Sequence, residues 1–510
     1  MPGRTLAPLL LLVPAVSAFA AFELAPPPRA VERAVFVDRA ILHEIRERNE
    51  LLSNLRHLSD EIGPRLTGSA NLEKANRWAA ERMKESGLAN VRLEPWEIPV
   101  GWERGSATMK LVEPDTGRGL TVAARGWTPG TASKTTGPVV LLEAKTKDDL
   151  ARYKGKLRNA VVLNGPPADV KPVTDLTYGP SRPRTPEEPK KSDPAAKDPP
   201  RPPLSELQAF RRELAAFLKS EDAAVVVSDA AKPHGLLITT GAWRDGDRGT
   251  EQDPMPAVFM AHEHYALLHR LATRPGNPPT RVEVDIANKF VPGPVTVYNT
   301  VGEVVGSEKP EEFVVVGAHL DSWDLATGTT DNGTGSCVVL EVARAVAALA
   351  KAGYPPRRTI KFVLFTGEEQ GLHGSKQFAK KHKDSLARMS AALVHDTGTG
   401  VVQGFGLQGR EAVRKVLEPE LETLKTVPGW KGVDLTSSGG TDHLSFEAAG
   451  VPGFACRQDM DEYRLTHHTQ SDTFDKAKGA NLVQGAQCVA VAAVRIANLP
   501  ELLPRDKPKK

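Results

Sequence analysis

The chain has 510 residues, enough for two to four domains, and its 40% of apolar residues can form a sizeable core. The formal net charge is only +3, and no concentrated basic segment or nucleic-acid-binding motif is present, which argues against a nucleic-acid partner. Three cysteines occur and none forms a Cys-x-x-Cys pair, which argues against a disulfide framework and a thiolate zinc finger; we expect buried free thiols.

The first 20 residues have the pattern of a cleaved secretory signal peptide. Arg4 provides a positive charge, residues 6–16 form a short apolar stretch, and residues 18–20 fit the small-x-small cleavage rule. The apolar stretch is short for a membrane span, and no later segment has the pattern of one. We therefore expect a secreted or periplasmic protein with no stable membrane association after cleavage, and an uncleaved anchor is the lesser alternative.

Residues 21–116 are predicted to be helical at first and then extended. Apolar residues at three- and four-residue intervals predict helices within 31–88, with a break at Gly63. Strand-like segments follow at 90–100 and 107–114. We assign residues 21–116 to the first part of the main domain.

The sequence pattern changes over residues 117–290 and predicts a smaller, β-rich inserted module. Short apolar strand segments dominate, with helical connectors between them. Within this module, residues 166–204 are rich in proline, lysine and acidic residues and cannot bury enough apolar surface to become ordered. We expect that segment to be a flexible surface loop.

Residues 291–510 alternate between predicted strands and predicted helices. The clearest strands are expected at 312–319, 358–366, 390–396 and 451–457. This alternation predicts an α/β fold with a mixed central sheet that helices cover on both faces. Ligands of such folds bind beyond the carboxyl ends of the strands.

Acidic and imidazole side chains lie where these strands end or in the long loops of this region. The group consists of His319, Asp331, Glu368, Glu369, Asp396, His467 and His468. Unpaired buried charge is costly, and solvated loop residues would not coincide with strand ends in this way. The pattern therefore favours a metal site over a solvated, turn-rich loop.

Such a set suits two zinc ions that share one carboxylate. Two metals about 4 Å apart can hold a water molecule and lower its pKa toward about 7. The adjacent Glu368 and Glu369 suit a division in which one binds metal and the other accepts the proton of the water. Asp321 suits a supporting role, in which it accepts a hydrogen bond from the second ring nitrogen of His319 and fixes the tautomer.

Five ordered motifs together resemble the M28 family of di-zinc exopeptidases: GAHLDSWD, GTTDNGTGS, FTGEEQGLHGS, HDTGTG and HHTQSDT. The resemblance covers roughly residues 295–499 and the N-terminal helices, and it is strongest to the carboxypeptidase Q group, secreted or lysosomal enzymes that act on short peptides. The middle module resembles the protease-associated domain inserted in many members, and YKGKLRNAVVLNG fits it best. The resemblance implies a zinc-exopeptidase-like main domain, completed by residues 291–510.

Motif by motif, the resemblance implies a complete site for two zinc ions or other divalent metals. The ligands of one ion would be His319, Asp331 and Asp396. Those of the other would be Asp331, Glu369 and His468. Glu368 matches the general base, His467 is a weaker ligand candidate, and the peptide bond after the bridging aspartate is often cis in the family. Thr334 stands where the family usually has serine and keeps the hydroxyl.

Three further residues are weaker candidates for substrate contact: Asp442, His443 and Arg464. Asp442 and His443 lie in a segment similar to one near the family's substrate pocket, and a turn capping the next helix is an equal alternative. Arg464 can pair with a substrate carboxylate, and an ordinary surface arginine fits the sequence equally well. Asp324 is interpreted as an ordinary loop acid and His373 as a surface residue.

We therefore expect a secreted di-zinc exopeptidase that cleaves short peptides in aminopeptidase, dipeptidase or carboxypeptidase mode. One alternative is a single-zinc glutaminyl cyclotransferase-like enzyme on the same fold. Asp396, the complete glutamate pair and the inserted module argue against it. The other alternative, a non-catalytic binding relative, ranks last because no implied ligand is missing.

Overall fold

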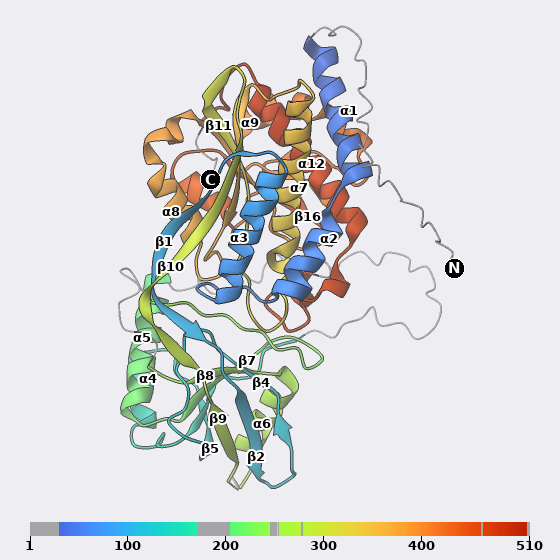
Figure 1. The fold of residues 1–510 in the computed structure, drawn as a ribbon. Helices are drawn as coiled ribbons and strands as arrows, with labels where there is room; N and C mark the ends of the chain where they lie inside the picture. The colour runs from blue at the N-terminus through green and yellow to red at the C-terminus, as the bar shows by residue number, and fades with distance from the viewer. Residues whose placement is uncertain are drawn as a thin grey trace, which may run out of the picture.

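The computed structural model describes residues 30–170, 204–244, 252, 254–276, 279–460 and 463–506. The signal peptide expected at 1–20 and most of the Pro-rich loop expected at 166–204 lie outside these residues. Within the described part, two eight-stranded sheets form the body of the protein, and Figure 1 shows the larger sheet above the smaller one.

The larger sheet contains the strands whose ends were expected to present the metal ligands. Its order is β1-β10-β12-β11-β13-β16-β14-β15, and the four strands from β12 to β16 are parallel. β10 and β14 flank these four strands in the antiparallel direction. In this order, the bounds are Ala89–Glu103, Lys289–Val304, Arg358–Phe365, Lys309–His319, Met389–Val394, Gly453–Gln458, Val402–Gly406 and Val433–Asp434. The predicted mixed central sheet is confirmed.

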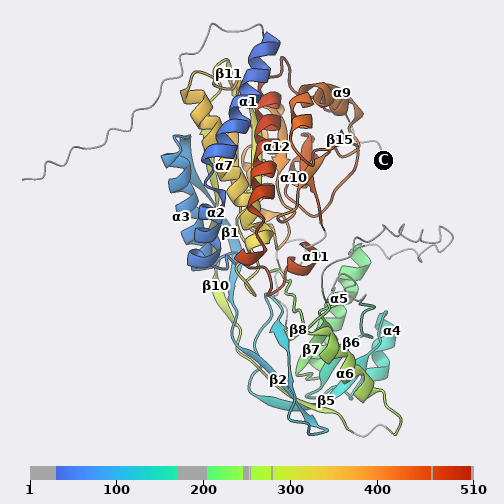
Figure 2. The same ribbon diagram turned by 90° about the vertical axis from the view of Figure 1, so that its right-hand side faces the viewer.

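Helices cover both faces of this sheet, as expected. Successive side chains of a strand point to opposite faces, so β11 places Val314 and Val316 on one face and Phe313 and Val315 on the other. The helices of the first face stand together in Figure 2 and are α1 (Ala30–Arg48), α3 (Ala70–Glu85), α7 (Thr334–Lys351) and α12 (Gly479–Asn498). On the second face lie α8 (His373–Lys381) and α10 (His443–Ala448).

The most apolar helices belong to the core. In the part of the chain that the structure describes, two helical segments, Thr329–Lys351 and Gly479–Asn498, are long and apolar enough to cross a membrane, yet most of each is buried inside the structure. Both pack against the larger sheet. The three cysteines, Cys337, Cys456 and Cys488, are buried and unpaired, as expected.

The smaller sheet has the order β3-β2-β9-β5-β6-β7-β8-β4. In this order, its strands are Gly119–Leu120, Ala107–Glu113, Arg281–Ile286, Thr135–Leu142, Val161–Asn164, Val225–Asp229, Ala257–Met260 and Val122–Ala124. The helices α5 (Leu204–Ser220) and α6 (His262–Ala272) pack against it. β2 was placed in the main domain by the boundary at residue 116, but it pairs with β9 in this sheet because β1 has already left the larger sheet.

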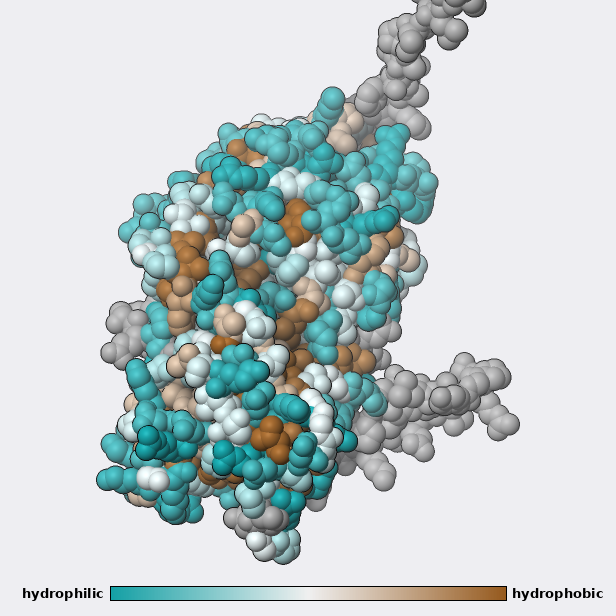
Figure 3. Space-filling model, turned by 60° about the horizontal axis from the view of Figure 1, so that its bottom comes forward, coloured by the Kyte–Doolittle hydropathy of each residue, from teal (hydrophilic) through white to brown (hydrophobic). Residues whose placement is uncertain are grey.

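The face seen in Figure 3, with the smaller sheet brought forward, is mostly hydrophilic, and hydrophobic residues appear on it in small separate groups. Among the described residues, the exposed large hydrophobic side chains are Phe36, Leu52, Val305, Leu435 and Met460. These residues come from separate segments, and isolated exposed apolar residues are normal for a folded protein.

β1 and β10 join the two sheets as one long antiparallel ribbon. Their register runs from Ala89 opposite Glu303 to Glu103 opposite Lys289. β10 pairs with β12 only from Thr300 onward, so the rest of the ribbon extends toward the smaller sheet (Figure 1). Four tryptophans from both parts pack in one cluster with the ribbon: Trp102, Trp127, Trp243 and Trp323.

Glu94 on β1 gives this ribbon a pH-dependent contribution to stability. Burial would raise the pKa of Glu94, but the hydrogen bond and charge of His382, followed by the charges of Arg92 and Lys381, outweigh burial and lower the pKa to about 2. A depressed carboxyl pKa stabilises the fold above the unfolded pKa of about 4.5, and this stabilisation is lost as the pH falls toward 2.

We expect Glu94→Gln to lower the free energy of unfolding at pH 7 by on the order of 3 kcal/mol. The difference from wild type should shrink steadily below about pH 4.5. Urea denaturation at several pH values measures it, with the exposed Glu97→Gln on the same strand as control. A difference that stays constant down to pH 3 would contradict the assigned ion pairs.

Candidate active site

Three of the parallel strands deliver candidate residues to one edge of the larger sheet. β11 ends at His319, Glu368 and Glu369 follow β12, and Asp396 follows β13. Parallel strands end at the same edge, so these residues lie close together although they are spread over 78 positions of the chain, from 319 to 396. The sequence-based expectation of a site at strand ends agrees with this arrangement.

His319 is the centre of a first group. Its Nε2 lies 3.0 Å from Oδ1 of Asp396 and 3.4 Å from Oδ1 of Asp331. The ligand atoms of the three side chains all lie within 4.8 Å of one another. These are the residues that the resemblance implies for one of the two metal ions.

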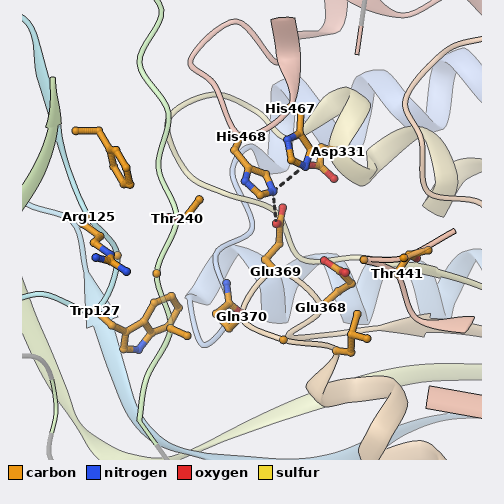
Figure 4. A pocket seen from close by; sticks show the side chains of 18 of the residues that line it. Arg125, Trp127, Thr240, Asp331, Glu368, Glu369, Gln370, Thr441, His467 and His468 are labelled. Atoms are coloured by element: carbon orange, nitrogen blue, oxygen red, sulfur yellow. Dashed lines mark ion pairs between the residues drawn. The ribbon is translucent and has the colours of Figure 1, made fainter. Parts of the chain in front are cut away.

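Asp331 also faces a second group. Its Oδ2 lies 3.5 Å from Nε2 of His468, and that nitrogen lies 2.9 Å from Oε2 of Glu369 (Figure 4). Asp331 thus presents one oxygen to His319 and the other to His468, as a bridging carboxylate would. The peptide bond from Asp331 to Asn332 is cis, as the resemblance implied.

His467, the weaker ligand candidate, lies at the rim of the second group. Its Nε2 is 3.9 Å from Oδ2 of Asp331, and 44% of its side chain is exposed. Its ring stacks on that of His468, with 3.7 Å between the ring centroids. The same three residues, Asp331, His467 and His468, offer ligand atoms within 4.8 Å of one another. His467 therefore lies near the site, but its one carboxylate contact is longer than the two that His468 makes.

Glu368 belongs to neither ligand group but lies beside the first. Its Oε2 is 3.9 Å from Nε2 of His319, and the residue lines the adjoining cavity. Burial raises the pKa of Glu368 well above its usual value; the charge of His319 opposes this effect and that of Asp396 adds to it. A carboxyl group with a raised pKa can accept and release a proton near neutral pH.

The buried carboxylates of the site need a positive partner. Oδ2 of Asp331 and Oε1 of Glu369 are buried and have no hydrogen-bond partner. Burial, followed by the charge of Asp331, raises the pKa of Glu369 well above its usual value. Burial would raise the pKa of Asp331 as well, but the hydrogen bond to His319 and the charge of His468 lower it. Buried charges are normally paired or coordinate metals, so these oxygens and imidazoles fit a divalent cation such as zinc.

Asp321 supports the site differently from the expected way. Nδ1 of His319 lies 2.9 Å from the backbone oxygen of Asp321, whereas the Asp321 carboxylate is 3.7 Å from that nitrogen. The carboxylate instead accepts hydrogen bonds from the backbone N–H groups of Glu368 and Glu369, each at 3.3 Å, and from the Thr67 hydroxyl at 3.0 Å. Asp321 therefore orients His319 through its main chain and the glutamate pair through its side chain.

Two buried side chains whose roles the sequence did not indicate hold the loop of Asp331. Asp472 accepts hydrogen bonds from the backbone N–H groups of Thr330 at 2.6 Å and of Asp331 at 3.1 Å. Arg65 is fully buried and donates to three carbonyl oxygens of the loop, those of Leu320, Thr327 and Gly328. Only the SDT motif could have drawn attention to Asp472, and no local pattern marks Arg65, because its partners in this loop are 255 to 263 positions away.

A cavity of about 1230 Å³ adjoins the site, and both sheets contribute to its walls. Tyr463 lines the cavity on the main-domain side, and burial together with the charge of Asp331 raises the pKa of its hydroxyl. The opposite wall comes from the smaller sheet and includes Arg125, Trp127 and Thr240 (Figure 4). The sequence analysis did not single out any of these four residues.

Direct substrate contact for Asp442 and His443 stays a prediction, and the structure places both side chains away from the cavity. Both side chains have no exposed surface, and neither lines the cavity, although the preceding residues 438–441 do. Their segment is the turn that leads into α10, which is the alternative considered from the sequence. Arg464 also does not line the cavity; its backbone oxygen accepts a hydrogen bond from Lys232.

Two residues interpreted as ordinary have defined contacts. Asp324, taken as a loop acid, accepts two hydrogen bonds from Arg104, at 2.9 and 2.7 Å. His373, taken as a surface residue, is half-buried and packs near Trp96 and Trp243, with ring centroids 6.2 and 4.6 Å away. Neither contact could be predicted from the sequence, because Arg104, Trp96 and Trp243 lie far from Asp324 and His373 along the chain.

Comparison with known proteins agrees with this geometry. The sequence model of peptidase family M28 matches residues 299–493. Carboxypeptidase Q from Mus musculus is 30% identical over 461 residues, which cover 90% of this chain and 88% of that protein. The Homo sapiens carboxypeptidase Q is 29% identical, with 90% of this chain and 87% of that protein covered.

Solved structures share the fold. A peptidase M28 precursor from Shewanella amazonensis superimposes with a TM-score of 0.74 at 24% identity and covers 94% of this chain and 100% of its own. A zinc aminopeptidase from Bacillus subtilis superimposes with a TM-score of 0.59 at 20% identity and covers 87% of this chain and 93% of its own. Both similarities cover most of the chain.

We expect Asp321→Asn to reduce the free energy of unfolding by about 1–3 kcal/mol, because the new amide group would face the donors of Glu368, Glu369 and Thr67. Urea denaturation of the two proteins measures this loss. The exposed Asp384→Asn serves as the matched control and should match wild type. Equal stability of Asp321→Asn and wild type would show that these hydrogen bonds do not support the site.

Proposed function

Because this chain belongs to peptidase family M28, we propose that it is a secreted exopeptidase in which two zinc ions and Glu368 hydrolyse the terminal bond of a short peptide. The observation that carries the proposal is the position of Asp331, whose two oxygens face His319 and His468 while Glu368 lies beside His319. A shared carboxylate between two imidazole–carboxylate groups suits a pair of zinc ions.

The proposed ligands follow the two groups. One ion would be held by His319, Asp331 and Asp396. The other would be held by Asp331, Glu369 and His468. Zinc suits imidazole and carboxylate donors, and the similar Bacillus subtilis enzyme is described as a zinc aminopeptidase. The contact of Nδ1 of His319 with the backbone oxygen of Asp321 assigns the proton to Nδ1 and leaves Nε2 free to bind metal.

The proposed reaction is hydrolysis with Glu368 as general base. Bound zinc would lower the pKa of water toward about 7 and polarise the scissile carbonyl. The carboxylate of Glu368 would take the proton of the attacking water and pass it to the leaving amine. The position of Glu368 at the cavity, 3.9 Å from Nε2 of His319, supports both halves of that transfer. Asp321 fixes the backbone from which the Glu368 side chain extends.

The cavity supports short peptides as substrates. It is bounded by the main domain on one side and by the smaller sheet on the other, which would limit how much chain extends past the reacting bond. We propose that the smaller-sheet part, expected at residues 117–290 and extended back to Ala107 by the pairing of β2 with β9, is a protease-associated-type insertion, and that the rest of 21–116 together with 291–510 forms the catalytic domain. The relatives named carboxypeptidase Q and zinc aminopeptidase keep both exopeptidase modes open.

We expect Glu368→Gln to lower kcat by about 100- to 10,000-fold, because the amide cannot accept the proton of the attacking water. Its bound zinc should remain at the wild-type amount, because Glu368 is not among the proposed ligands. Hydrolysis of a dipeptide panel and elemental analysis of the same samples measure both quantities, with Glu97→Gln as control. Full activity in Glu368→Gln would rule out this residue as the base.

We expect removal of metal by a chelator to abolish dipeptide hydrolysis and addition of zinc to restore it. Metal that binds only the folded protein also raises the unfolding temperature, so the zinc-loaded protein should melt at a higher temperature than the chelated protein. Elemental analysis should give two zinc ions per chain. Hydrolysis that persists in fully chelated protein would contradict the proposed chemistry.

A further inference from the structure

The loop that carries His468 adopts a conformation that needs external support. His468 has a backbone φ of 60°, in the left-handed region that non-glycine residues rarely occupy. Such a residue costs on the order of 1–3 kcal/mol and persists only where its surroundings hold it in place. Within its own domain, the backbone N–H groups of His467 and Thr469 bond to the carbonyl oxygens of Tyr463 and Thr466. The carbonyl oxygen of His468 has its partner elsewhere.

That partner comes from the smaller-sheet part of the chain. The backbone N–H of Thr239 donates to the oxygen of His468 at 3.0 Å. Next to it, Ile238 and Thr469 form an antiparallel bridge. Residues 237–239 therefore pair with residues 468–470 as a short piece of sheet between the two parts of the protein.

Gln470 extends this pairing with its side chain. Its Oε1 accepts a hydrogen bond from the backbone N–H of Leu237 at 2.6 Å, and its Nε2 donates to the oxygen of Gly235 at 3.3 Å. The amide thus satisfies one donor and one acceptor of the opposite segment. Only an amide side chain of this length can do both.

Arg104 ties the same place to the loop that follows His319. Its guanidinium binds Asp324 through Nε at 2.9 Å and Nη2 at 2.7 Å, and Nη2 also donates to the hydroxyl of Thr239 at 3.1 Å. The side chains of Arg104 and Asp324 are only 16% and 13% exposed. A bidentate, largely buried pair of this kind is strong and sensitive to geometry. One side chain therefore contacts the main-domain loop through Asp324 and the smaller-sheet segment through Thr239.

Aromatic side chains also pack between the two parts of the protein near His468. The ring of Trp323, next to Asp324, lies 6.0 Å from that of His468 and 6.2 Å from that of Trp127. A Cβ atom on Gly126 would lie 2.8 Å from the Trp323 ring, so the smaller-sheet part approaches this tryptophan as closely as a glycine allows. The two parts are thus in direct contact around the proposed ligand His468.

We propose that Gln470 and Arg104 are positioning residues that make the docked smaller-sheet part a condition for metal binding at His468. The inference rests on the proposed function, in which His468 is a ligand of the second zinc ion. Without these contacts, the His468 backbone would relax from its left-handed conformation and move its imidazole away from Asp331 and Glu369. Loss of such supporting contacts typically weakens metal affinity by about 10- to 100-fold.

The test compares full-length zinc-loaded wild type with Gln470→Ala and Arg104→Ala. Zinc release is titrated with a chromophoric chelator, and kcat, KM and the unfolding temperature are measured on the same samples. We expect one of the two zinc ions to bind about 10- to 100-fold more weakly in each variant and the other to keep its wild-type affinity. We also expect kcat to fall with the occupancy of the weaker ion and to recover in excess zinc.

Matched controls separate positioning from general stability. Arg92→Ala also removes a partly buried, ion-paired arginine of the ribbon, and Gln487→Ala removes a glutamine whose amide donates to the oxygen of Leu42. We expect both variants to have a lower unfolding temperature and unchanged affinities for both zinc ions. Gln470→Glu keeps the acceptor for the N–H of Leu237 and should bind zinc more tightly than Gln470→Ala. If Gln470→Ala fails to fold, the zinc affinity of Gln470→Glu relative to wild type is the measurement that tests the role of Gln470.

The outcomes distinguish this inference from the function on which it rests. Folded variants that hold both zinc ions as tightly as wild type would overturn the positioning role and leave the two-zinc proposal intact. Equal weakening of both ions would overturn it as well, because the contacts would then act on the whole site. Wild-type protein that binds only one zinc ion would contradict the two-zinc proposal itself, and the inference with it.

Discussion

The buried carboxylate of Asp331 is the constraint on which the rest of the site depends. Both of its oxygens face imidazole groups, and one of them lacks any hydrogen-bond partner. Placing such a group in the interior is costly unless positive charge compensates it. The surrounding structure is arranged for a divalent cation that would provide this charge: Asp472 and Arg65 hold the loop of Asp331 through its backbone, and two histidines from distant segments offer ligand nitrogens.

The strands and helices of the main domain, and the covering of its sheet on both faces, could be predicted largely from local sequence patterns. β11 alternates its side chains between two cores, and the apolar helices α7 and α12 cover one of them, so the apolar pattern already implied a sheet with two covered faces. The partner of β2 could not be predicted in this way. Its sequence shows only that it is a strand, and its pairing with β9 depends on where β1 leaves the larger sheet.

The candidate ligands could be recognised because each follows a strand or a distinctive motif, and they lie together in the structure. The residues that support them could not, because their contacts are made through backbone atoms or across long sequence distances. Asp324 has no local feature that reveals Arg104, 220 positions earlier. Asp442 and His443 show a different difficulty: a segment that resembles part of a substrate pocket contributes its backbone turn to the wall of the cavity and keeps these two side chains buried.

The way the smaller-sheet part is attached explains how it can support a ligand loop. A domain joined by flexible linkers would fix no atom of its partner to within a hydrogen-bond distance. Here the chain leaves and returns through β1 and β10, which pair with each other from Ala89 opposite Glu303 to Glu103 opposite Lys289. Arg104 comes directly after this ribbon, so the same element that sets the orientation of the smaller sheet also places the guanidinium between Asp324 and Thr239. The strands β1 and β10 therefore determine both how the two sheets are arranged and how the contacts around His468 are made.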